Sequence, residues 1–131
     1  YEAYKKSGPN VLGVEALQGD DGCTGVKVNT ADGYADYLFS ATDMQAHHPS
    51  KRVSFCGGLG LIREKEGQIQ LMYLGCGRSL KKGNFVLESD HDVYAAIYMQ
   101  HGVWYYSATG PVRVKIGKET KELNEGYNQK L

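Results

Sequence analysis

The stretch LGLIREKEGQIQLMYLGC, residues 59–76, holds two segments of largely alternating apolar and polar residues around Glu66-Gly67. Such alternation is typical of a β-strand that buries one of its faces. A glycine-containing dipeptide between two such segments predicts a tight hairpin turn. We therefore expect an antiparallel hairpin with LGLIREKE (59–66) and QIQLMYLGC (68–76) as its strands.

The same alternation recurs along nearly the whole chain, and no window keeps the spacing of an amphipathic helix over several turns. The further candidate strands are VLGVEAL (11–17), CTGVKVNT (23–30), GYADYLFSA (33–41), RVSFCG (52–57), SLKKGNFVLES (79–89), DVYAAIYM (92–99), VWYYSA (103–108), PVRVKIG (111–117) and TKELN (120–124). Turn residues separate them at spacings of roughly 8–12 residues. This pattern predicts an all-β chain of about ten short strands, folded as an antiparallel two-sheet β-sandwich of jelly-roll type.

The length of 131 residues fits one domain that can bury its own core. We expect a linker or frayed N-terminus over 1–10, a single sandwich over 11–123 and a polar tail over 124–131. The chain begins with Tyr1 instead of methionine, which suggests a segment of a longer protein.

The net charge is zero, because 15 Lys and Arg balance 15 Asp and Glu. A neutral chain has no overall field that would draw it to nucleic acid or to an anionic membrane. It also lacks an apolar run long enough for a membrane helix or a signal peptide. We therefore expect neither partner, and any recognition by charge has to be local.

The cysteines and histidines offer little chemistry. Cys23, Cys56 and Cys76 are odd in number and form no CxxC pair, so we expect small buried apolar residues, with a Cys56–Cys76 disulfide as the alternative. His47 and His48 fall in a polar loop and His91 in an expected hairpin turn. Surface positions are favoured for all of them over metal ligation or catalysis.

Two glycine-rich turns also fail to define a site. GCGRSL (75–80) is not followed by the helix that a phosphate-binding loop needs. Asp20 and Asp21 in GDDG (19–22) carry the oxygen ligands that calcium prefers, yet acids are commoner in such turns as plain turn residues. We predict no catalytic residue, no metal and no cofactor, with a calcium ion at this turn as the alternative.

Aromatic residues concentrate near the end of the chain. In GVWYYSATG (102–110), Trp104 and Tyr106 share one strand face, and in DVYAAIYM, Tyr94 and Tyr98 share another, opposite Val93, Ala95 and Ile97. A hairpin through Gln100-His101-Gly102 would make these strands neighbours. Aromatic faces can stack on the apolar face of a pyranose, and they can equally close the rim of a two-sheet core. Both interpretations stay open.

Four blocks of the sequence resemble the C-terminal β-sandwich region of heparinase II/III-like polysaccharide lyases, which include alginate lyases. The blocks are DGYADYLFSATD, FCGGLGLIREKEGQIQLMYLGCG, KKGNFVLES and VWYYSATGPVRVKIG. The residues at matching places are Asp36, Tyr37, Phe39, Gly57, Gly60, Ile62 and Arg63. The resemblance spans most of residues 11–117.

The resemblance implies a role beside a catalytic domain. Lyases of that family cleave uronate-containing polysaccharides by β-elimination, mainly with residues of a helical toroid domain that this sequence does not contain. It implies a non-catalytic accessory domain that binds or positions an acidic polysaccharide, such as alginate or a glycosaminoglycan, for an attached catalytic domain. An extracellular or periplasmic location in a bacterial enzyme would follow.

An acidic ligand needs local cations, and arginine suits a carboxylate because its guanidinium can donate two parallel hydrogen bonds. The predicted ligand-binding residues are Trp104, Tyr106, Tyr94, Tyr98, Arg63, Arg78, Lys81 and Lys82. The alternatives are a purely structural domain that docks against a missing partner domain, and a small lyase or hydrolase with His47, His48 or His91 in a cleft near a tyrosine or a carboxylate.

Overall fold

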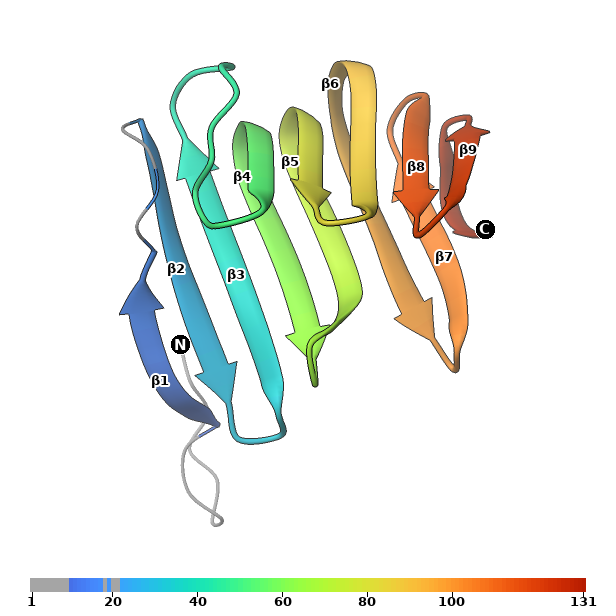
Figure 1. Ribbon diagram of the computed structural model, residues 1–131. Coiled ribbons are helices and arrows are strands. Elements are labelled where there is room, and N and C mark those ends of the chain that lie inside the picture. Colours follow the sequence, from blue (N-terminus) through green and yellow to red (C-terminus); the bar gives the residue numbers. More distant parts are fainter. Residues whose placement is uncertain (1–9, 18, 20–21) are drawn as a thin grey trace.

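The computed structural model describes residues 10–17, 19 and 22–131, and within them every element is a strand (Figure 1). The strands are β1 (Val11–Ala16), β2 (Cys23–Thr30), β3 (Tyr34–Ala41), β4 (Val53–Lys65), β5 (Gln68–Lys82), β6 (Phe85–Gln100), β7 (Val103–Ala108), β8 (Val112–Ile116), β9 (Glu119–Leu123) and β10 (Gly126–Lys130). All the strand pairs are antiparallel. The predicted all-β chain of about ten strands is confirmed.

The strands form one hydrogen-bonded sheet that bends into two layers. Its order is β1-β2-β3-β4-β5-β6-β7-β10, and β8 pairs with both β6 and β9. The long strands β4, β5 and β6 curl over at one end (Figure 1) and so belong to both layers. The large layer consists of β1, β2, β3, 59–65, 68–74, 93–100, β7 and β10, and the small layer of 53–57, 77–82, 85–89, β8 and β9.

Glycines make the bend. Gly57 pairs with Gly77, and the ladder shifts register on both sides of Gly77. A Cβ atom on Gly77 would lie 2.8 Å from the Cys56 carbonyl oxygen and 2.9 Å from the Gly57 Cα atom. The two backbones therefore touch where no side chain fits, and the strands can turn sharply there.

The bend corrects one expectation. The segments RVSFCG and LGLIREKE were predicted as separate short strands, but they are the two halves of β4. The glycines between them bend the strand without ending its hydrogen bonding, because each glycine still offers its N–H and C=O groups to β5. For the same reason SLKK continues β5, and FVLES continues into DVYAAIYM in β6.

The core lies between the two layers. In the large layer Ile62, Met72, Ile97 and Tyr106 stand opposite one another on neighbouring strands and face inward. The small layer contributes Leu80, Leu87 and Val114 from its inner face, all buried. Burying each large aliphatic side chain contributes about 1.5–3 kcal/mol. The apolar faces of the two layers therefore hold the sandwich together.

Two hairpin turns follow the sequence rules closely. Glu66-Gly67 and His101-Gly102 are both two-residue turns, with φ values of 54° and 78° in the first and 53° and 78° in the second. Positive φ at both positions is the signature of the type I′ turn that fits strand twist. Both predicted hairpins are confirmed.

The end of the chain differs from its prediction. Residues 126–130, expected within a polar tail, form β10, which pairs with β7 at Gly126–Ala108 and Lys130–Tyr105. Polar side chains do not prevent backbone pairing at a sheet edge, and a register shift before Gln129 hides the alternation. The expected linker 1–10 lies outside the described residues except for Asn10.

The cysteines are also less buried than expected. Cys23 and Cys56 are half-buried, Cys76 is exposed, and no disulfide joins any of the three. Cys76 has a φ of 50° at the bend, which turns its side chain away from the core. Burial raises the pKa of the Cys56 thiol, whose Sγ atom donates to the Met44 carbonyl at 3.2 Å.

We expect Gly77→Ala to lower the free energy of unfolding by about 1–3 kcal/mol, because its methyl group overlaps the Gly57 backbone. Gly13→Ala is the matched control, since no atom lies within 4 Å of its added Cβ. It should change stability by less than about 0.5 kcal/mol. Urea unfolding of both variants measures this, and equal midpoints would contradict the close approach at the bend.

Candidate functional site

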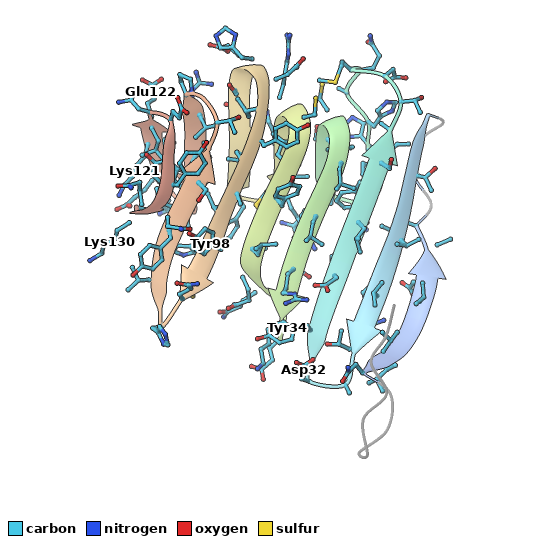
Figure 2. The ribbon with its side chains drawn as sticks, turned by 180° about the vertical axis from the view of Figure 1, so that it is seen from behind. Asp32, Tyr34, Tyr98, Lys121, Glu122 and Lys130 are labelled. Carbon is cyan, nitrogen blue, oxygen red and sulfur yellow. The ribbon has the colours of Figure 1, made fainter. Side chains whose placement is uncertain are left out.

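The large layer has one face toward the core and one toward solvent, and its outer face carries a row of residues in register. The row runs through directly paired residues, which are Asp36, Arg63, Leu71, Tyr98, Tyr105 and Lys130. A parallel row beside it is Leu38, Leu61, Tyr73, Ala96 and Ser107. Figure 2 views the molecule from behind and labels Tyr34, Tyr98 and Lys130, which come from β3, β6 and β10.

Tyr73, Tyr94, Tyr98 and Tyr105 form what we call the tyrosine platform. Tyr98 and Tyr105 stack with ring centroids 6.0 Å apart and an angle of 18° between the rings. The Tyr98 hydroxyl donates to the Asn128 side-chain oxygen, which fixes one end of the ring. Tyr94 is 54% exposed on the same strand face. The platform therefore presents phenol rings that packing and hydrogen bonds already orient.

Small residues shape the platform between its rings. Ala96 lies between Tyr94 and Tyr98 on β6 and opposite Tyr73 on β5. A Cβ atom on Gly75 would lie 3.0 Å from Cε1 of Tyr73, so glycine allows this ring to rest against the backbone. A flat partner can thus approach between the tyrosines without meeting a large side chain.

Cations lie at one end of the platform. Arg63 donates from Nε to Asp36 Oδ1 at 2.7 Å and from Nη2 to Asp36 Oδ2 at 2.9 Å. Its guanidinium carbon is 4.8 Å from the Tyr34 ring centroid, and Lys65 Nζ is 5.0 Å from the same centroid. The hydrogen bond to Asp36 raises the pKa of Arg63, so it stays charged. Arg63 and Tyr98 line a shared hollow of about 260 Å³.

The other predicted cations point elsewhere. Arg78 pairs with Asp92 at 2.8 Å on the outside of the bend. Lys81 faces outward from the small layer, 3.4 Å from Glu88, whereas Lys82 faces the space between the layers and contacts Glu64 at 2.5 Å. Neighbouring residues of a strand point to opposite faces, so Lys81 and Lys82 do not act as a pair.

The aromatic residues of β6 and β7 divide between the core and the solvent-facing surface. Tyr106 is only 8% exposed, and its hydroxyl donates to the Asn124 carbonyl at 3.0 Å, so it belongs to the core. Trp104 is half-buried at the rim of the core, with its ring centroid 5.9 Å from that of Phe85. Tyr94 and Tyr98 face solvent opposite buried Val93, Ala95 and Ile97, as the alternation predicts.

Sequence reasoning missed Tyr73 and Tyr105 as members of this face. The alternation in QIQLMYLGC places Leu71 and Tyr73 on one side of β5, so a signal for Tyr73 was present. The register shift between Arg63 and Glu64 hid which residues of β4, β5 and β6 stand side by side. Residues on neighbouring strands can be paired correctly only when the position of that register shift is known.

The structure corrects two expectations about the histidines. His47 is 5% exposed, because its backbone forms a bridge with Phe55 that draws the residue inward. Its Nε2 atom lies 2.7 Å from Asp43 Oδ1, and this hydrogen bond lowers the pKa of Asp43. His91 is exposed, yet it lies within β6 and not at a hairpin turn, because β6 continues through the bend.

Metal ligands do not gather in the part of the chain that the structure describes, where no group of three or more His, Cys, Asp and Glu could hold an ion. Asp20 and Asp21, the alternative calcium ligands, lie outside the described residues. GCGRSL runs in extended β5, without a helix after it. No helix of the described ranges is long and apolar enough to cross a membrane.

We expect Tyr106→Phe to cost about 1 kcal/mol of stability, because it removes the hydrogen bond to the Asn124 carbonyl. Tyr105→Phe, on the opposite face of the same strand, keeps its stacked ring and should change stability by less than about 0.5 kcal/mol. Thermal or urea unfolding compares the two. Equal losses in both variants would mean that the buried hydroxyl has no special role.

Comparisons with known proteins place the chain among polysaccharide lyase domains. The family model of the endo-acting ulvan lyase C-terminal domain matches residues 11–99, which is more than half of the chain. No curated protein and no solved structure matches it. The match supports the expected C-terminal domain of a polysaccharide lyase, but not the heparinase II/III-like or alginate-lyase assignment. The chain belongs to the family of endo-acting ulvan lyase C-terminal domains.

Proposed function

We propose that this domain is non-catalytic and binds an acidic polysaccharide on the tyrosine platform, so that it positions the polymer for an attached lyase domain. The observation that carries the proposal is the outward row of Tyr98 and Tyr105 in line with Arg63 and Lys130. Stacked rings suit the apolar faces of sugars, and the flanking cations suit carboxylates.

Family membership suggests the first ligand to test. The family description names ulvan as the polymer that the whole enzyme cleaves. A lyase acts by β-elimination beside a uronate carboxylate, so its substrate carries repeated negative charges. Arg63, Lys65 and Lys130 would meet those charges at the ends of the platform, while alginate and glycosaminoglycans test how far the preference extends.

The shape of the platform suits an internal segment of a polymer. Tyr94 and Tyr98 are four residues apart on β6, which corresponds to about 13 Å along a strand. A sheet face has no wall at either end, so a chain can continue past it in both directions. An endo-acting enzyme, which cuts within chains, needs this kind of support. We expect weak affinity for each segment, because a shallow face desolvates few side chains.

A second candidate function is a structural one, in which the same face docks against the catalytic domain. Leu59 is 45% exposed and Val14 is 65% exposed on this side of the sheet, and exposed apolar residues often mark interfaces. Such an interface would bury the platform and leave it without affinity for sugars. The third alternative, a small lyase, needs a cleft that holds His47, His48 or His91 near a tyrosine or a carboxylate. His47 does lie 2.7 Å from Asp43, but it is only 5% exposed, and no described histidine lines the hollow next to Tyr98.

An extracellular or periplasmic location is part of the proposal. A polysaccharide too large to enter the cytoplasm has to be met outside it. The absence of a disulfide among the three cysteines does not oppose this location, since a secreted protein can lack disulfides.

We expect Tyr94→Ala to weaken ulvan binding about fivefold, because loss of one stacking ring costs about 1 kcal/mol. The matched control is Val14→Ala, which removes an exposed apolar side chain from the same face at β1, the far edge of the sheet. Its affinity should equal that of the wild type. Titration calorimetry with ulvan, alginate, heparin and a neutral glucan measures both variants.

Two results would contradict the proposal. One is the absence of binding to every acidic polymer by the wild-type domain, which would favour the structural role. The other is equal affinity for the neutral glucan and ulvan, which would exclude a part for Arg63 and Lys65.

A further inference from the structure

A second surface lies at the end of the sandwich away from the glycine bend. There the β4–β5 and β5–β6 hairpin tips enclose a hollow of about 420 Å³, which we call the end groove. Its lining includes Arg52, Glu64, Lys82, Asn84, Phe85 and Trp104. A volume of this size falls in the range of small-ligand pockets, about 300–1,000 Å³.

The groove has an aromatic wall. Phe85 of the small layer and Trp104 of the large layer pack with centroids 5.9 Å apart and an angle of 50°. Buried Ile69 lies behind them. A ligand chain that enters between the layers therefore meets the core and has to end there. Trp104 also lines a neighbouring hollow of about 260 Å³, and its indole is therefore reachable from outside the core.

The charges of the groove leave one cation available. Lys82 Nζ is 2.5 Å from Glu64 Oε2 and 4.1 Å from the centroid of the Tyr37 ring, so its charge is already matched. Arg52 is exposed, and its guanidinium makes no ion pair or hydrogen bond with any other described residue. With two cations and one carboxylate, the lining has a net charge of +1 (2 − 1), which favours an anion.

Arg52 is held in an unfavourable backbone conformation. Its φ is 67°, at the third position of a turn in which the Val53 N–H donates to the Ser50 carbonyl at 3.2 Å. Glycine or asparagine is preferred at such a position. The Arg52 carbonyl also accepts from the Gly83 N–H at 3.4 Å, which ties this turn to the β5–β6 hairpin.

We propose that the end groove is a separate carbohydrate site that binds the terminal uronate of an acidic oligosaccharide. The carboxylate pairs with Arg52, the sugar ring stacks on Trp104, and the side-chain amides of Asn84 and Gln68 bond its hydroxyls. β-Elimination leaves a uronate with a ring double bond at each new non-reducing end, and this flattened ring suits an indole face. The end groove and the platform are separate surfaces, because the platform lies on the outer face of the large layer. The inference therefore rests on the proposed function only for the class of ligand.

The test uses the fluorescence of Trp104, the single tryptophan of the chain. Short ulvan oligosaccharides produced by a lyase should quench it saturably, whereas neutral cello-oligosaccharides of the same length should not. Arg52→Gly should weaken this binding about tenfold or more, because a charge-assisted contact is lost. Its stability should stay equal or rise, since glycine accepts the positive φ.

Variants separate this site from the platform. Tyr94→Ala should quench like the wild type, even if polymer binding to the platform is lost or was never present. Arg52→Lys keeps the charge but loses the paired donors, and should fall between wild type and Arg52→Gly. An unquenched wild type, an equal response to neutral oligosaccharides, or full binding by Arg52→Gly would each overturn the proposal.

Discussion

The contact between the Gly57 and Gly77 backbones determines the architecture, because it lets three long strands turn from one layer into the other. A side chain at either position would push the two backbones apart and so weaken the turn that covers the apolar face of the large layer. The turn folds Leu80 and Leu87 over Ile62 and Ile97. It also brings Lys82 to Glu64, so the end groove exists only because of the bend.

Packing of the core fixes the side chains of the tyrosine platform. On β6, Ile97 is fully buried, and its neighbour Tyr98 faces outward because strand residues alternate. Packing of Ile97 therefore fixes the position of the Tyr98 ring before any ligand arrives, and the stack with Tyr105 limits its rotation. A platform that is already ordered loses little side-chain entropy on binding, which offsets part of its shallow contact area.

Sequence alternation predicted which way single residues face, and failed where neighbouring strands had to be aligned. The outward position of Tyr94 and Tyr98 and the turns at Glu66-Gly67 and His101-Gly102 followed from local rules. The bend at Gly57 did not, because glycine ends a strand as readily as it bends one. The sequence did not indicate Arg52 as a site residue, because its place in the end groove depends on hairpin tips that are distant in sequence.

The neutral chain also explains what kind of recognition to expect. Five cations of the two layers already have a carboxylate partner, and Arg63–Asp36, Arg78–Asp92 and Lys82–Glu64 are three of these pairs. A ligand carboxylate has to compete with these partners, so bulk charge adds little and the dependence on salt should be shallow. Discrimination then rests on ring stacking and on the donors without a carboxylate partner. Arg52 is such a donor, and it lines the same hollow as the single indole of the chain.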